Sequence, residues 1–302
     1  MTLATYLRSC LLIVVIAAAA LAAGSLPETA PRWLPVAIGI AAPFLFAPAA
    51  IAIEFTAGAI LDPQLPRSAR GDVVRVWWQE TVANWRVFLW RQPFTARADG
   101  PITPDPQRCA VLLIHGYLCN RAIWRPMLEA GVLREFNVAS VNLQPVFGSI
   151  EHYADVIDIE LDRLLRASGA TRAVLIGHSM GGLAARAYLQ RHGDARVARV
   201  ITLATPHHGT IFARLGIGAV TRQMARGSAF LADLAAGETP ALRARFVCVA
   251  TRDDNLIVPR SSPLLAGSTR HVLAGVGHLA LIEDPRAWRI VADEIRSGCC
   301  AQ

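Results

Sequence analysis

Residues 177–181 read Gly-His-Ser-Met-Gly, a G-x-S-x-G pentapeptide that follows an apolar run and precedes an alanine-rich stretch. The apolar run at 173–176 predicts a buried strand, and the stretch from Met180 predicts a helix. Glycines on both sides of the serine let the chain turn tightly, which holds Ser179 strained and exposed at the edge of a sheet. This context makes the motif specific for a nucleophilic serine.

From residue 109 onward the chain alternates short apolar runs with amphipathic helical stretches. One such stretch, 150–165, carries its apolar residues on one helical face and stops at Gly169. This alternation predicts a mostly parallel sheet flanked by helices, with a further helix from Pro285. The expected strands cover residues 110–114, 136–143, 173–176, 200–203, 246–250 and 270–273.

A serine hydroxyl is a weak nucleophile, so a base must take its proton and a carboxylate must orient that base. In this strand-serine-helix context the acid precedes the histidine along the chain. Asp253 and Asp254 both follow the predicted strand 246–250, and the residues alone leave both open. Of the later histidines, His271 lies inside an apolar strand, whereas His278 lies in a glycine-rich loop. We therefore expect His278 to be the base.

Acyl transfer through a serine also needs two backbone amides that bind the developing oxyanion. Met180 directly follows the nucleophile and is expected to supply one amide. The early strand ends at Ile-His-Gly-Tyr, where Gly116 permits close backbone approach, so Tyr117 is expected to supply the other. His115, Gly116 and His178 are expected to line the substrate site, and His115 is expected to brace its loop.

With these motifs in place, residues 101–296 resemble bacterial triacylglycerol lipases and related esterases of the α/β-hydrolase superfamily. The resemblance implies the α/β-hydrolase fold, an acyl-enzyme mechanism with Ser179, Asp254 and His278 as its triad, and no metal or cofactor for the chemistry. It favours Asp254 over Asp253 as the acid. The matching segments, in order, are 115–116, 177–181, 205–210, 254–259 and 275–279.

The resemblance predicts hydrolysis of carboxylic esters, with acyl glycerols or similar lipid esters as substrates. A thioesterase, amidase, phospholipase or acyltransferase with the same triad is the alternative. A binding module without catalysis is a third reading, which the complete set of site residues disfavours. Residues 211–242 are apolar enough to line an acyl pocket as a short cap, or to pack on the sheet as an ordinary helix.

Two uncharged runs, 9–26 and 33–53, precede the catalytic part. They predict an N-terminal apolar helical region with two membrane spans, anchored at a bacterial inner membrane. The arginine distribution favours both ends in the cytoplasm. The alternative is a cleaved signal peptide, a buried arm and a secreted enzyme. Residues 73–90, rich in tryptophan and arginine, suit either a membrane-interface helix or packing against the core.

These runs divide the chain into a membrane-anchoring region at 1–66, a connecting segment at 67–100 and a catalytic domain at 101–302. The net charge is +7, and all thirty basic residues are arginine, which excludes lysine Schiff-base chemistry. The arginines are scattered and match no nucleic-acid-binding motif, so we expect a membrane surface and no nucleic acid as partner.

The six cysteines have spacings that fit neither a zinc site nor a disulfide framework. Cys109 and Cys248 lie in apolar, strand-like runs and are expected to be buried thiols. The adjacent pair His207 and His208 resembles a metal site only superficially, because neighbouring loop residues rarely present both rings to one ion. We therefore expect a structural role for this pair and no metal.

Overall fold

The computed structural model describes residues 2–62, 70–97, 102–105 and 107–299. The domain boundaries expected at 66/67 and 100/101, and Cys300, lie outside these described residues.

A parallel six-stranded sheet forms the centre of the described chain, with strand order β2-β1-β3-β4-β5-β6. Each of the six apolar runs identified in the sequence forms one strand, which confirms the predicted fold class. The strands are β1 (Ala110–Ile114), β2 (Asn137–Val141), β3 (Ala173–His178), β4 (Val197–Leu203), β5 (Phe246–Thr251) and β6 (Thr269–Leu273).

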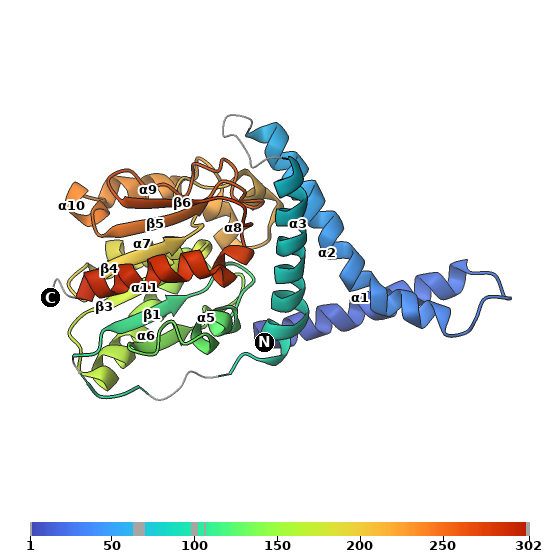
Figure 1. Ribbon diagram of the computed structural model, residues 1–302, viewed down its shortest axis with the longest axis horizontal. Helices are drawn as coiled ribbons and strands as arrows, with labels where there is room; N and C mark the ends of the chain where they lie inside the picture. The colour runs from blue at the N-terminus through green and yellow to red at the C-terminus, as the bar shows by residue number, and fades with distance from the viewer. Residues whose placement is uncertain (1, 63–69, 98–101, 106, 300–302) are drawn as a thin grey trace.

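Helices cover both faces of the sheet, as Figure 1 shows. In β1 the side chains alternate between two cores, with Leu112 in one cluster and Val111 and Leu113 in the other. Strands buried on both faces are typical of parallel sheets, which is why they are continuously apolar. The first cluster lies under α6 (Ile150–Ser168), α7 (Met180–His192), α8 (Ala219–Met224) and α9 (Ala229–Gly237). The second lies under α5 (Arg125–Glu129) and α11 (Pro285–Cys299).

Local sequence signals begin and end these helices. The Ser149 side chain accepts from the His152 amide at the start of α6, and Gly169 ends that helix at φ 75°. Short helical segments complete the connections between the main elements. They are α4 (Gln92–Phe94), α10 (Pro240–Arg243), the π-helix η1 (Trp85–Arg91) and the 3-10 helices η2 (Arg121–Trp124), η3 (Ile211–Leu215) and η4 (Ala280–Glu283).

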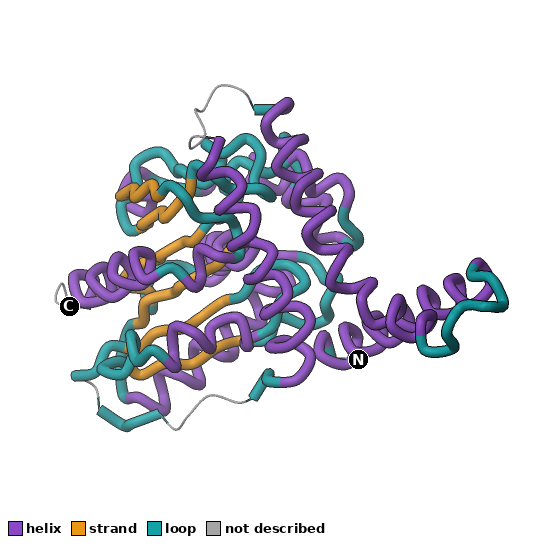
Figure 2. The backbone as a smooth tube through the Cα atoms, turned by 45° about the vertical axis from the view of Figure 1, so that its right-hand side comes forward, coloured by secondary structure: helices purple, strands orange, loops and turns teal. Residues whose placement is uncertain are grey.

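The N-terminal region forms a helical hairpin that extends away from the sheet (Figures 1 and 2). Its helices are α1 (Leu3–Ser25) and α2 (Leu34–Leu61), and both are long and apolar enough to cross a membrane. Helix α3 (Arg70–Asn84) lies between the hairpin and the catalytic body. The Trp77 indole N–H donates to the Pro48 carbonyl at 2.9 Å, which ties α3 to α2.

Helix α3 packs against the catalytic core along one side. Glu80 and Ala83 are buried there, while Val76 packs against Ile51 and Phe55 of α2. Trp78 on the other side is 50% exposed. Of the two readings of residues 73–90, packing against the core therefore describes the inner side of the helix. A membrane-interface role for its outer side stays a prediction.

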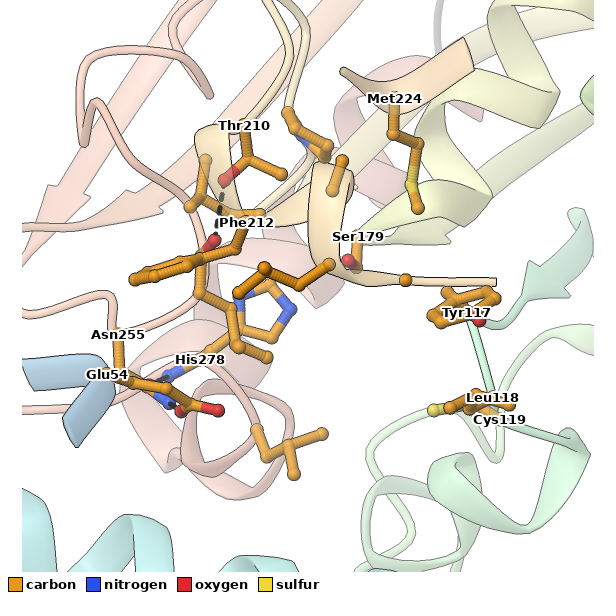
Figure 3. A pocket seen from close by; sticks show the side chains of 18 of the residues that line it. Glu54, Tyr117, Leu118, Cys119, Ser179, Thr210, Phe212, Met224, Asn255 and His278 are labelled. Carbon is orange, nitrogen blue, oxygen red and sulfur yellow. Dashed lines mark hydrogen bonds between the residues drawn. The ribbon is translucent and has the colours of Figure 1, made fainter. Parts of the chain in front are cut away.

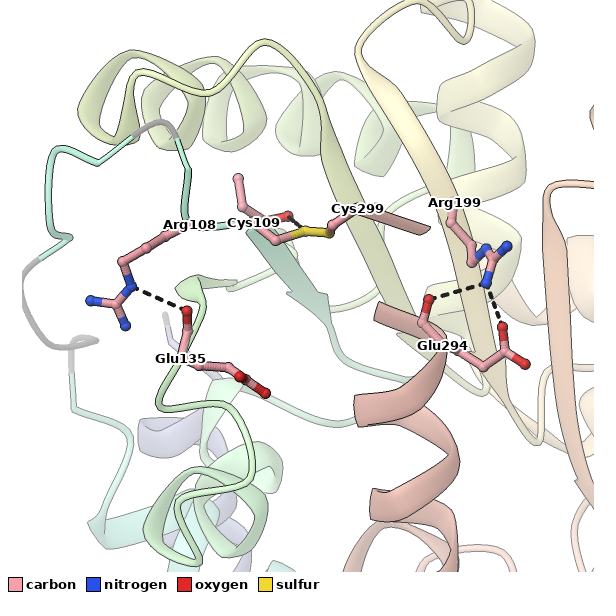
Figure 4. Close-up of a disulfide and its surroundings, with 7 residues drawn as sticks. Arg108, Cys109, Glu135, Arg199, Glu294 and Cys299 are labelled. Atoms are coloured by element: carbon pink, nitrogen blue, oxygen red, sulfur yellow. Dashed lines mark hydrogen bonds and ion pairs between the residues drawn. A yellow bond between two sulfur atoms is a disulfide. The ribbon is translucent and has the colours of Figure 1, made fainter. Parts of the chain in front are cut away.

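The expectation of buried thiols was wrong for Cys109, which forms a disulfide with Cys299 (Figure 4). Cys109 directly precedes β1, and Cys299 ends α11, so the sheet and the packing of α11 bring their Cα atoms to 6.0 Å. Sequence spacing does not reveal this contact because the two residues are 190 positions apart. Cys248 is a buried free cysteine, as expected.

Candidate active site

Ser179 lies in the turn between β3 and α7, with φ 53° and ψ −123°. A positive φ is uncommon and strained for a residue other than glycine. The tight packing around the turn explains its glycines. A Cβ at Gly181 would stand 2.3 Å from the Ile114 carbonyl oxygen, and one at Gly177 would stand 2.5 Å from the Gly182 nitrogen. The turn is thus held by close backbone contacts that only glycine permits.

His278 and Asp254 form a buried pair in the loops that follow β6 and β5. The His278 Nδ1 atom lies 2.9 Å from Asp254 Oδ2 and 3.1 Å from Asp254 Oδ1. The carboxylate is itself held in place, because Asp254 Oδ1 accepts the amides of Leu256 at 2.9 Å and Ile257 at 2.7 Å. This arrangement fixes the imidazole plane and the tautomer that carries its proton on Nδ1.

The loop after β1 lies against the serine turn. A Cβ at Gly116 would be 3.1 Å from the Ser179 Cβ, so the glycine lets the two backbones approach. His115 is bonded inside this loop: its Nε2 accepts the Leu143 amide at 2.9 Å, and its Nδ1 donates to the Gly116 carbonyl at 2.9 Å. Burial lowers the pKa of His115 to about 4, so this bracing ring is neutral.

The two residues expected to donate to the oxyanion, Met180 and Tyr117, lie next to Ser179 and in the loop after β1. Met180 is the first residue of α7, and the first amides of a helix have no carbonyl partner within it. Tyr117 directly follows Gly116, and its hydroxyl donates to the Ile217 carbonyl at 2.9 Å. Tyr117 thereby connects the loop after β1 to the segment 211–242.

The pKa values of His278 and His178, the two histidines at the cavity, are shifted in opposite directions. Burial by itself lowers the pKa of His278, but the carboxylates of Asp254, Glu80 and Glu54 outweigh it and raise the pKa above its ordinary value. His178 is also buried, and desolvation together with the charge of His278 holds its pKa well below the ordinary range. His278 is therefore the ring that gains a proton readily, which a general base requires.

One apolar cavity of about 430 Å³ connects these groups (Figure 3). Ser179 and His278 line it, and Figure 3 shows both side chains facing the same space. Ser179 is only 9% exposed, and it lies in the wall of this cavity. The apolar lining residues include Ile51 and Ile53 from α2, Phe88 from η1, Phe212 and Leu215 from η3, and Met224 from α8. The segment 211–242 thus contributes to the wall of the cavity.

Other sequence candidates lie elsewhere. Asp253 Oδ2 accepts the Gly275 amide at 2.6 Å and braces the loop after β6. His271 lies in β6 and bonds Glu294 at 3.1 Å, away from the cavity lining. His207 is buried with its Nε2 3.1 Å from the Thr202 hydroxyl. Within the described residues no group of three or more metal-ligand side chains is found.

Two residues that line the cavity beside His278 were not predicted from the sequence, Glu54 in α2 and Glu80 in α3. A signal for Glu80 exists in the sequence. Its neighbours at helical spacing, Val76 and Ala83, are both apolar, so the carboxylate stands alone on an apolar face. Charged residues in such positions rarely remain buried without a partner.

Comparisons with known proteins agree with this fold. A protein family described as alpha/beta hydrolase fold matches residues 110–239. Epoxide hydrolase 3 of Xenopus tropicalis is 30% identical over 109 residues, 34% of this chain and 29% of that protein. A triacylglycerol lipase of Pseudarthrobacter phenanthrenivorans is 49% identical over 51 residues, 17% of this chain and 16% of that protein. The chain therefore spans less than a third of the length of either relative.

The crystal structure of Aspergillus fumigatus lipase B superposes with a TM-score of 0.61 at 11% identity. The superposition covers 95% of this chain and 85% of that one, which establishes a shared fold. Together with the family match at 110–239, it shows that the chain has the α/β-hydrolase fold and is similar to lipases and esterases.

Proposed function

We propose that this chain is a serine-dependent carboxylic-ester hydrolase that acts on lipid esters. The observation that carries the proposal is the convergence of a strained serine and a carboxylate-bound histidine on one apolar cavity. The triacylglycerol lipase relative supports the same reaction class.

In the first half-reaction, the Ser179 Oγ attacks the ester carbonyl carbon while the His278 Nε2 takes the hydroxyl proton. The carbonyl oxygen becomes an oxyanion, and the amides of Tyr117 and Met180 bind it. When the tetrahedral intermediate collapses, the bond to the alkoxy oxygen breaks. The alcohol leaves with the proton from His278, and the acyl group remains on Ser179.

In the second half-reaction, water gives a proton to His278 and attacks the acyl carbon. A second tetrahedral intermediate forms and collapses, which releases the carboxylic acid and returns the proton to Ser179. Asp254 stays ionised throughout, since its task is to orient the ring and to stabilise the imidazolium. Its two amide bonds hold the carboxylate for this task.

The cavity favours an acyl chain over a polar substrate, because aliphatic and aromatic side chains form most of its lining. Its volume is within the range of ligand sites in proteins. An ester series from acetyl to palmitoyl, assayed below and above the solubility limit, tests this substrate class. A lipid esterase gains activity on long chains at an interface, whereas highest activity on soluble acetyl esters would contradict it. Parallel acyl thioesters distinguish a thioesterase with the same triad.

We further propose that the α1–α2 hairpin anchors the enzyme in a membrane. In the most apolar 18-residue stretch of each helix, only 6% and 17% of the residues are buried within the protein, so most of this apolar surface is exposed. Cell fractionation with an alkaline carbonate wash tests the anchor. Activity that stays in the pellet supports it, and activity released into the supernatant would favour the cleaved signal peptide.

The Cys109–Cys299 disulfide bears on the orientation of this anchor. Disulfides persist in oxidising compartments and are rare in the cytosol. We therefore place the catalytic domain on the oxidising side, the periplasm if the membrane is a bacterial inner membrane. This reverses the orientation expected from the arginines, whose imbalance is small. Protease added to intact spheroplasts should digest the domain, and full protection would show a cytosolic location.

A further inference from the structure

Glu80 reaches from α3 to the backbone directly beyond His278. Its Oε1 accepts the Leu279 amide at 2.8 Å, and its Oε2 accepts the Ala280 amide at 2.9 Å. These amides begin the 3-10 helix η4, where no preceding carbonyl is available to them. The contact is close enough that a Cβ at Gly277 would stand 2.4 Å from Glu80 Oε2. Glu80 therefore caps the catalytic loop from outside the hydrolase core.

A second carboxylate, Glu54 of the hairpin helix α2, supports the same loop. The Asn255 side-chain oxygen accepts the His278 amide at 3.1 Å, and Glu54 in α2 accepts from the other end of that side chain at 2.7 Å. Glu54 thus fixes which way the amide group of Asn255 points. Three consecutive amides, 278–280, are in this way bound by side-chain oxygens.

We infer that the N-terminal helices complete the active site, with Glu80 as a positioning residue that holds the His278 loop and Glu54 as its support through Asn255. This inference rests on the proposed Ser179–His278 chemistry. If α2 and α3 served only as a membrane anchor, they would have no role in the reaction. We infer instead that they set the position and the proton affinity of the base.

The charge of Glu80 also affects the pKa of His278. Burial raises the pKa of Glu80 to about 7, while the two amides and His278 oppose that rise. The charges of His278 and Asp254 act on the Glu80 carboxyl, and the charge of Glu54 also acts on His278. With a pKa of about 7, Glu80 is ionised in part of the molecules at neutral pH, and its ionised form stabilises the His278 imidazolium. Removal of its charge therefore lowers the pKa of His278, and the acid limb of kcat/KM moves to lower pH.

The test uses the full chain in detergent micelles and compares Glu80→Gln with the wild type. The variant keeps the shape but places an NH₂ group against a backbone N–H. We expect kcat to fall about tenfold or more, the typical effect of losing a bond to a charged acceptor, with KM unchanged. We also expect the acid limb to move to lower pH, which a purely structural residue would not cause.

A further variant separates the effect of the Glu80 side-chain length from the effect of its charge, and a second variant serves as a control. Glu80→Asp keeps the charge but shortens the side chain, so kcat falls while the acid limb stays near its wild-type position. The matched control is Asp72→Asn in the same helix, where the exposed carboxylate pairs with Arg75. Both kcat and the acid limb should remain at wild-type values in this control.

Rates are normalised to the fraction of protein that a fluorophosphonate probe labels, so only folded enzyme is counted. Wild-type kcat and an unmoved acid limb in Glu80→Gln would overturn the inference. Failure of the proposed function gives a different result, because the wild type itself would then neither react with the probe nor hydrolyse esters.

Discussion

Removal of the disulfide between Cys109 and Cys299 is expected to destabilise the catalytic domain by about 5 kcal/mol through the entropy of the unfolded chain. The value follows from the 190-residue separation that the bridge closes. Packing in the native state should change little, because α11 remains attached through the buried side chains of Val291 and Ile295. The double variant Cys109→Ala/Cys299→Ala should therefore fold but unfold at lower denaturant concentration.

Urea unfolding of the full chain in micelles, followed by tryptophan fluorescence, measures this difference. Reducing agent should lower the midpoint of the wild type and leave the double variant unchanged. Thiol titration of the unfolded wild type should release two more thiols after reduction. Equal midpoints for the two proteins, or no additional thiols, would refute the reasoning and with it the argument for an oxidising compartment.

Asp254→Asn should lower kcat on the order of 10⁴-fold, because the amide no longer stabilises the His278 imidazolium or its tautomer. Asp253→Asn should cost far less, since that side chain binds a backbone amide, and steady-state kinetics showing equal losses would mean that the acid is misassigned. Asp62→Ala removes a carboxylate that binds the buried Arg260 guanidinium and should lower the unfolding midpoint in thermal or chemical unfolding. An unchanged unfolding midpoint in this last variant would show that the ion pair does not join α2 to the catalytic body.

The sheet was predictable from sequence because its central strands are continuous apolar runs buried on both faces, as Val111 and Leu112 illustrate. The edge strand β6 is more exposed. The serine turn was predictable for a local reason, since Gly177 and Gly181 are required by backbone contacts within the turn and the strand beside it. Chain order left His271 and His278, and the glycine-rich loop around His278 favoured the latter. The catalytic roles of these residues stay predictions until they are measured.

The remaining features depend on contacts between distant segments, and local patterns do not encode them. Cys109 and Cys299 meet only because α11 runs back across the sheet. Glu80 binds the Leu279 amide across 199 positions. The apolar residues at helical spacing around Glu80 indicate that it is buried, but they do not indicate which residue it binds. Asp253 and Asp254 follow the same strand, so the residues alone left both open and the resemblance favoured Asp254. In the structure Asp254 bonds the imidazole and Asp253 binds the Gly275 amide.

The central claim is that Ser179 is an activated nucleophile in an ester-hydrolysing site. Fluorophosphonate labelling of the full chain, followed by peptide mapping in a mass spectrometer, tests it most directly. The account predicts a single labelled residue, Ser179, with loss of ester hydrolysis in proportion to labelling and no labelling of folded Ser179→Ala. Labelling at another residue, or a folded Ser179→Ala variant that retains even a tenth of wild-type turnover, would contradict the account.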